Sequence, residues 1–234
     1  MESPIRALIF DFDGLIVDTE SPEFETWLEI FNEFGAELEF EEWVACLGTS
    51  AAAFDAASIL YQRTGITMDN ETLWTEQKKR SIQKANRLQP LPGVKSLITE
   101  AASTGLHLAV ASSSPRMWVE GHLERLGLLP FFQVVLTKED VPSVKPDPAL
   151  YSKAIQLLGV DVHQAIALED SPNGIRAARR AGLFCVAIPN PISKRLDLSE
   201  ASFILESLAG VTLQELTALI SIHNNGHKPQ SIQV

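Results

Sequence analysis

Cysteine and long apolar runs are both scarce in this chain of 234 residues. Its two cysteines, Cys46 and Cys185, stand far apart, and neither belongs to a Cys-x-x-Cys pair, so we expect two buried, reduced thiols. No apolar stretch approaches the roughly 20 residues that a membrane-spanning helix needs. The residues before the first apolar run contain neither the basic region nor the long apolar region of a signal peptide. A cytoplasmic protein without a membrane partner is therefore expected.

Basic residues are also in deficit. The chain has 19 lysines and arginines against 30 acidic residues, which gives a formal net charge of −11. This balance argues against a nucleic-acid partner, because binding to a phosphate backbone requires a basic face. A small anionic ligand remains compatible with it, since one pocket can be positive on an acidic protein. We expect a monomer that binds a small molecule.

What the chain does have is a regular alternation of apolar runs and helical periods. Hydrophobic residues make up 45% of it, enough for a substantial core. The runs typical of strands covered on both faces are 5–10, 106–111, 132–137, 165–168 and 183–188, with a weaker one at 202–205. Helical periods lie between them at 94–103, 118–126, 150–158 and 175–181. This pattern predicts an α/β fold with a Rossmann-like, doubly wound parallel sheet.

One segment interrupts the alternation. Residues 20–88 contain no convincing strand, but amphipathic patterns recur around 24–34, 54–61 and 72–85. We interpret this segment as a helical cap inserted after the first strand, with a proline- and glycine-containing hinge at 89–93. The predicted organisation is an α/β core of 1–19 and 89–222, a helical cap of 20–88, and a C-terminal tail of 223–234.

Two carboxylates follow the first apolar run directly. Asp11 and Asp13 stand two residues apart where ligands bind in open α/β sheets, and Gly14 allows a sharp turn after them. Such a pair repels itself unless a cation or a shared proton intervenes. Hard oxygen ligands favour Mg²⁺. The alternative is a pair of solvated loop aspartates.

Further polar groups follow later strands. Ser112 and Ser113 end the run 106–111, where a helix N-terminus can bind an anion; a simple helix cap by Ser114, with Pro115 as the first helical residue, is the alternative. Lys145 precedes a proline at a strand-to-helix junction and can neutralise a phosphate, although an isolated lysine is usually solvated.

A second acidic pair, Glu169 and Asp170, ends the run 165–168 before another proline-started helix. By itself it is also compatible with a helix-capping turn. A doubly wound sheet, however, brings all four motifs to one rim. Carboxylates, hydroxyls and a lysine gathered at one rim are suited to phosphoryl transfer.

In these motifs the chain resembles the haloacid dehalogenase-like hydrolases. The likeness is greatest to the branch with a small helical cap, which includes β-phosphoglucomutase and many sugar-phosphate phosphatases. The resemblance implies that Asp11 is the nucleophile and Asp13 the general acid and base. Ser112, the N–H group of Ser113 and Lys145 would hold the phosphoryl group. The Mg²⁺ ion would be bound by Asp11, the backbone carbonyl of Asp13, Asp170 and, directly or through water, Glu169.

The same resemblance distinguishes activities within the family. β-Phosphoglucomutases typically carry a histidine near the start of the first cap helix, and the corresponding residue here is Glu23. That favours a phosphatase acting on a phosphorylated metabolite over a phosphomutase, although Glu23 is also a favourable charge near a helix N-terminus. Gly48 and Thr49 match a substrate-facing cap loop or a simple helix cap. A dehalogenase fits less well, because such enzymes generally lack the second aspartate, and a non-catalytic binding protein is the remaining alternative.

Overall fold

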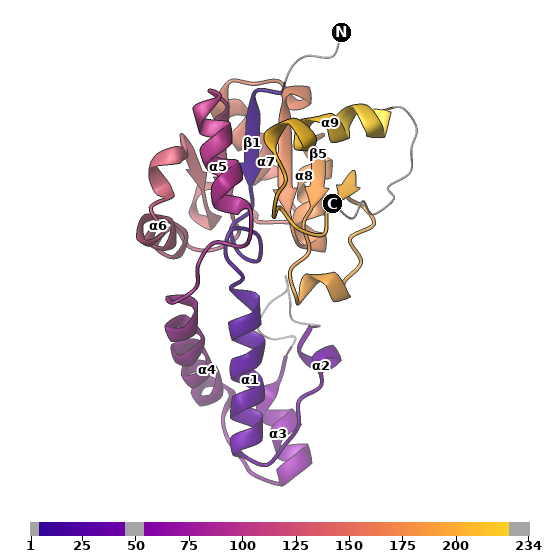
Figure 1. Cartoon of the computed structure of the whole chain (residues 1–234). Coiled ribbons are helices and arrows are strands. Elements are labelled where there is room, and N and C mark those ends of the chain that lie inside the picture. Colours follow the sequence, from indigo (N-terminus) through magenta and orange to yellow (C-terminus); the bar gives the residue numbers. More distant parts are fainter. Residues whose placement is uncertain (1–4, 45–53, 225–234) are drawn as a thin grey trace. The chain divides into compact units, whose positions relative to one another are not determined.

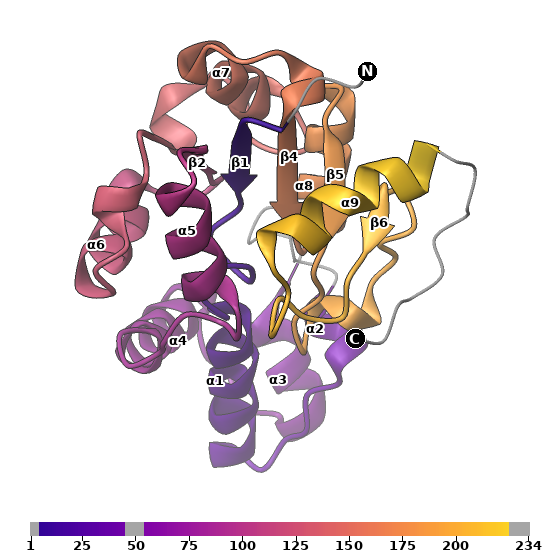
Figure 2. The same cartoon turned by 45° about the horizontal axis from the view of Figure 1, so that its top comes forward.

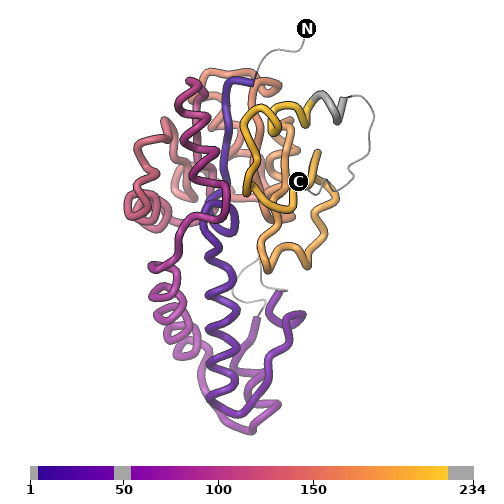
Figure 3. The backbone as a smooth tube through the Cα atoms, in the orientation of Figure 1, coloured from indigo at the N-terminus to yellow at the C-terminus, as the bar shows by residue number. Residues whose placement is uncertain are grey.

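The computed structural model describes residues 5–44 and 54–224. The chain forms two compact units: Thr19–Leu88 make up one, and Met1–Asp18 with Gln89–Val234 make up the other, as far as their residues are described. Figure 3 follows the chain from its first strand into the helical unit and back. The described helices include none that is long and apolar enough to cross a membrane.

The α/β unit is built on one sheet of six strands in the order β3-β2-β1-β4-β5-β6. All neighbouring strands are parallel. The strands are β1 (Ala7–Phe10), β2 (His107–Ala111), β3 (Val134–Leu136), β4 (Ala165–Glu169), β5 (Phe184–Ala187) and β6 (Phe203–Ile204). Every residue of β1 and β4 is buried, as expected for strands covered on both faces. The predicted α/β class and parallel sheet are confirmed.

Helices cover both faces of this sheet. α5 and α9 pack against each other over one face, and α7 and α8 pack against each other over the opposite face (Figures 1 and 2). The helices of this unit are α5 (Val94–Ser103), α6 (Arg116–Arg125), α7 (Ala149–Leu158), α8 (Pro172–Arg180) and α9 (Leu213–Asn224). Short 3₁₀ segments lie at Leu129–Phe131 (η2), Lys138–Asp140 (η3), Val162–Gln164 (η4) and Ser193–Arg195 (η5). Side chains alternate along the strands, so Ala7 and Ile9 join the apolar core formed with α7 and α8.

The other unit is helical, as predicted for a cap. It contains α1 (Glu20–Glu33), α2 (Phe40–Val44), α3 (Ala56–Thr64) and α4 (Asn70–Ala85). Its core is aromatic: the Trp27 ring lies 5.0 Å from both Phe54 and Trp74 in edge-to-face contacts, and Trp27 is buried. Trp27 therefore serves packing within this unit.

Two details at the ends of the predicted elements differ from expectation or lie outside the structure. α9 continues to Asn224, so the helix extends two residues into the segment 223–234 that the sequence assigns to a tail; residues 225–234 lie outside the described residues. Cys185 is a buried free thiol in β5, whereas Cys46 lies outside the described residues.

Candidate active site

The carboxyl ends of three central strands bring most of the sequence candidates to one edge of the sheet. Phe10 lies beside Val110 on one neighbouring strand and Leu168 on the other. Asp11 follows β1, Ser112 follows β2, and Glu169 ends β4, so the three continue at the same level of the sheet.

Three carboxylates meet at this edge. Asp11, Glu169 and Asp170 each have an oxygen within 4.8 Å of the others, and all three residues are buried, Glu169 and Asp170 at 0% exposure. Their concentration in so small a buried volume is electrostatically unfavourable unless cations compensate it.

Lys145 supplies one compensating charge. It lies in the segment between η3 and α7, and its Nζ donates hydrogen bonds to Asp11 Oδ1 and, at 2.6 Å, to Glu169 Oε1. Burial by itself lowers the pKa of Lys145, but the carboxylates of Asp11 and Glu169 outweigh it, and the pKa rises above its ordinary value. The lysine is therefore charged throughout the physiological range.

The compensation is incomplete. Burial raises the pKa of Asp11 to about 8, and the Glu169 carboxylate adds to the rise although Lys145 opposes it. Three carboxylates against one ammonium group carry a formal charge of −2 when all four are ionised. A divalent cation would neutralise that charge, and oxygen donors are the ligands that Mg²⁺ prefers. The donor set therefore fits a divalent metal.

Glu169 is also held by neutral groups, of which Tyr151 was not among the residues singled out from the sequence. The Tyr151 hydroxyl, on α7, donates to Glu169 Oε1 at 2.5 Å, and the Asp170 N–H group donates to Oε2 at 3.1 Å. Gly174, in the first turn of α8, lies so close that a Cβ atom there would overlap the Glu169 carboxylate. Ser171 caps this helix and Pro172 begins it, as the sequence predicted.

The turn after β1 is joined to Asp170 by Asn190, which the sequence reasoning missed. Asn190 Nδ2 donates to Asp170 Oδ2 at 2.8 Å and to the Gly14 carbonyl at 3.1 Å. Its Oδ1 accepts the N–H groups of Ile192 and Ser193, which fixes the orientation of the amide. Gly14 has a φ of 83°, and a Cβ there would overlap Asp170 and Asn190. The position of Asn190 just beyond β5, at the same edge, is the signal that could have indicated it.

Asp13 is turned towards the segment that follows β2. Its Oδ2 accepts the Ser114 hydroxyl at 2.6 Å and the Ser112 hydroxyl at 3.4 Å, and its Oδ1 accepts the Trp118 indole N–H at 2.8 Å. The expected cap by Ser114 is wrong. α6 begins at Arg116 with Pro115 in the N-cap position, so Ser114 lies one residue before the cap, and its hydroxyl donates to Asp13.

Four further candidates are Ser113, Glu23, Gly48 and Thr49. Ser113 directly follows Ser112 and its side chain is exposed, whereas the predicted role belongs to its backbone N–H group and stays a prediction. Glu23 lies on α1 in the helical unit with its side chain exposed, and its backbone carbonyl accepts a hydrogen bond from Gln77 at 3.2 Å. Gly48 and Thr49 lie outside the described residues.

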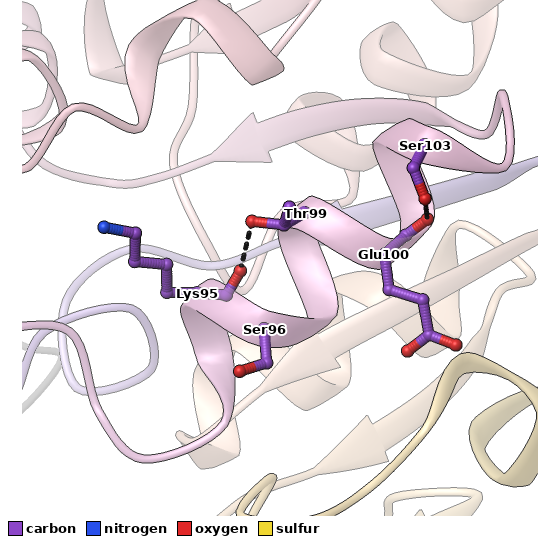
Figure 4. Close-up of a pocket in the computed structure, with 5 residues that line it drawn as sticks. All are labelled: Lys95, Ser96, Thr99, Glu100 and Ser103. Carbon is purple, nitrogen blue, oxygen red and sulfur yellow. Dashed lines mark hydrogen bonds between the residues drawn. The ribbon is translucent and has the colours of Figure 1, made fainter.

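A shallow hollow along α5 offers no comparable chemistry. Figure 4 shows the Thr99 hydroxyl turned onto the Lys95 carbonyl and the Ser103 hydroxyl onto the Glu100 carbonyl, at 2.8 and 2.7 Å. Both hydroxyls are therefore used by the helix itself. The lining residues are Lys95, Ser96, Thr99, Glu100 and Ser103.

The residues of the acidic edge lie within the part of the chain that matches a known family. The family model described as haloacid dehalogenase-like hydrolase matches residues 8–188, which include both acidic pairs, the serine turn and Lys145. The chain belongs to this family. A Bacillus subtilis (strain 168) relative named "Putative phosphatase YhcW" is 41% identical over 221 residues, covering 94% of this chain and 98% of the relative.

The chain is also similar to a named hexitol phosphatase and to two solved structures. Hexitol phosphatase B of Escherichia coli O157:H7 is 29% identical, covering 92% of this chain and 95% of the relative. The crystal structure of a Rhodobacter sphaeroides CbbY variant in complex with xylulose-(1,5)bisphosphate is 27% identical, with a TM-score of 0.70 over 91% of this chain and 99% of that one. A β-phosphoglucomutase from Clostridium difficile shares the fold, at 22% identity and a TM-score of 0.68 over 94% of this chain and 99% of that one.

Proposed function

We propose that this family member is a Mg²⁺-dependent phosphatase that hydrolyses a small phosphorylated metabolite of the sugar-phosphate class through an aspartyl-phosphate on Asp11. The observation that carries the proposal is the buried contact of Asp11 with Lys145 beside the carboxylates of Glu169 and Asp170. A carboxylate nucleophile next to a fixed cation and a candidate metal site suits attack on phosphorus. The phosphatase relative supports the reaction, and the sugar-phosphate ligand of the CbbY structure supports the substrate class.

In the first step, an oxygen of Asp11 forms a bond to phosphorus while the bond from phosphorus to the substrate oxygen breaks. The leaving oxygen takes a proton from Asp13. In the second step, water attacks the phosphorus of the aspartyl-phosphate and gives a proton to Asp13, and orthophosphate leaves as Asp11 is regenerated. Ser112, the Ser113 N–H group and Lys145 hold the phosphoryl oxygens.

The metal would be held by Asp11, Asp170, the backbone carbonyl of Asp13 and Glu169, the last directly or through water. When bound, Mg²⁺ supplies positive charge next to the phosphoryl oxygens. Lys145, which donates to Asp11 and Glu169, supplies a second positive charge, and the two together would offset the negative charge of an incoming phosphate.

Water is the proposed acceptor because Glu23 stands where related mutases carry a histidine. A β-phosphoglucomutase-type transfer back to the sugar is the alternative. Incubation with β-glucose 1-phosphate separates the two, since a phosphatase releases orthophosphate and a mutase forms glucose 6-phosphate.

The proposal is tested by measuring orthophosphate release from a panel of sugar phosphates, nucleotides and other phosphorylated metabolites, with Mg²⁺ and with chelator. We expect Mg²⁺-dependent turnover that falls at least about 1,000-fold in Asp11→Asn. Asp147→Asn is the matched control, because Asp147 accepts the Ala149 N–H group at the start of α7 and is exposed. Folded Asp11→Asn protein with normal turnover would contradict the nucleophile, and phosphate binding without turnover in the wild type would favour a non-catalytic protein.

A further inference from the structure

The carboxylate of Asp13 is bound on both of its oxygens by groups from one short segment of chain. Trp118, in the first turn of α6, binds Oδ1 through its indole N–H, and Ser114, just before α6, binds Oδ2 through its hydroxyl. Neither Ser114 nor Trp118 has a role in the proposed reaction. An O–H donor on one oxygen and an N–H donor on the other restrict both side-chain torsions of Asp13, because hydrogen bonds weaken steeply when their geometry is lost.

The Trp118 ring itself packs against a second ring. The His122 ring lies one helical turn further along α6 and meets the indole edge-to-face, with 4.3 Å between ring centroids. His122 is buried and also lies 6.0 Å from the ring of Phe12, the residue between the two aspartates. The indole is therefore fixed against the same stretch of chain that presents Asp13.

Fixation of Asp13 matters because the residue stands on a turn rather than within a strand. Gly14 follows it with a positive φ, and the Gly14 N–H group donates to the Val17 carbonyl at 2.7 Å, closing a tight loop. A side chain on such a loop is less constrained by packing than Asp11, which is buried at the end of β1, and Asp13 itself is only half-buried. Groups that transfer protons must lie within a few tenths of an ångström of the productive position, which requires supporting hydrogen bonds.

We propose that Trp118 and Ser114 are positioning residues for Asp13: the indole N–H and the hydroxyl hold its carboxylate in the orientation from which it exchanges protons with the leaving oxygen and with water. This rests on the proposed function of Asp13. The role belongs to the start of α6, a segment for which the sequence motifs suggested only phosphate binding and helix capping.

The kinetic test uses Trp118→Phe, which keeps a ring against His122 and removes the N–H donor, and Ser114→Ala. We expect each to lower kcat about 10- to 100-fold while KM changes less than about twofold, because an orientation needed for proton transfer is lost and binding is not. Glu124→Gln, on the exposed face of α6, is the control and should retain wild-type kcat.

A direct test of the contact does not depend on turnover. The chain has four tryptophans, so ¹⁵N-labelled protein gives four indole N–H signals in an NMR spectrum. Trp118→Phe identifies one signal by its loss, and Trp74→Phe removes a different one as a control. Asp13→Asn should shift the Trp118 signal and leave the other three in place. Should Trp118→Phe fail to fold, single substitutions of the other three tryptophans by phenylalanine assign their signals, and the Trp118 signal follows by elimination.

The outcomes separate the two proposals. If Asp11→Asn is inactive but Trp118→Phe and Ser114→Ala keep kcat within about twofold of wild type, the positioning role is wrong and the phosphatase proposal stands. If Asp11→Asn is active, the proposed reaction is wrong whatever the effects of Trp118→Phe and Ser114→Ala. An indole signal of Trp118 that is unchanged in Asp13→Asn overturns the contact itself.

Discussion

Lys145 offers the most stringent test of the electrostatic reasoning. Its side chain is 5% exposed and joins Asp11 and Glu169, whose side chains are 9% and 0% exposed. The substitution Lys145→Met keeps most of the length of the side chain and removes the charge. In chelator, two buried carboxylates then lose their shared cation.

The expected cost follows from that burial. Removing one partner of a buried ion pair destabilises a protein by about 3–5 kcal/mol, because the remaining charge stays out of water without compensation. For a chain of this size, about 1 kcal/mol corresponds to a change of about 2–4 °C in Tm, so we expect a loss of about 6–20 °C.

The cost should depend on pH. Because burial raises the pKa of Asp11 from 3.8 to about 8, the stability linked to its protonation is fully present below about pH 3.8 and is lost as pH rises through about 8. Lys145 opposes the rise in the pKa of Asp11, so without Lys145 this carboxyl group holds its proton still more tightly in the folded state. The destabilisation by Lys145→Met should therefore be larger at pH 9 than at pH 5.

Thermal unfolding of the metal-free protein at both pH values measures the effect. Lys153→Met is the matched control, because Lys153 pairs with Asp140 at 3.9 Å on the surface of α7 with its side chain 38% exposed. Such an exposed pair is worth about 0–1 kcal/mol. Equal losses in Lys145→Met and Lys153→Met, or a Lys145→Met loss that shrinks with rising pH, would refute the reasoning.

Three further predictions concern the same unit. Adding Mg²⁺ to chelator-treated protein should raise Tm, and more at pH 8 than at pH 5, because the metal competes with protons for the carboxylates. Calorimetry in buffers of different ionisation enthalpy should detect the released protons. Equal stabilisation at both pH values would count against the acidic site. Burial lowers the pKa of His122 below 6.5, so stability linked to its neutral ring is present above that pH and is lost as pH falls through the lower folded value. Denaturant titrations at pH 7 and pH 5 should therefore show that His122→Phe loses less unfolding free energy on acidification than the wild type. Equal losses in the two proteins would argue against this reasoning. Gly174→Ala places a methyl group on the Glu169 carboxylate and should destabilise the protein by at least about 1–3 kcal/mol. Gly121→Ala lies in open space within α6 and should stabilise the protein by about 0.5–1 kcal/mol. Urea unfolding measures both changes in free energy, and changes of the same sign would contradict the packing argument.

Much of the fold follows from local patterns. Apolar runs of four to six residues separated by helical periods favour a parallel sheet covered on both faces, and each observed strand overlaps one of these runs. The helical character of 20–88 follows from the same periodicity, although α2 is too short to leave a clear period of its own.

The sequence by itself also determined which candidates share the edge of the sheet. Parallel strands all end on one side, so Asp11, Ser112 and Glu169 had to approach one another once each was recognised as lying at the end of a strand.

Only the tertiary structure decided which groups hold these residues in place. Asn190 and Gly14 are 176 residues apart, and Trp118 and Asp13 are 105 apart. Such pairs depend on where a helix or loop directs a particular side chain, which no local pattern encodes. For the same reason the sequence context of Ser114 suits a helix cap, whereas in the structure the helix begins one residue later and the Ser114 hydroxyl donates to Asp13 Oδ2 at 2.6 Å.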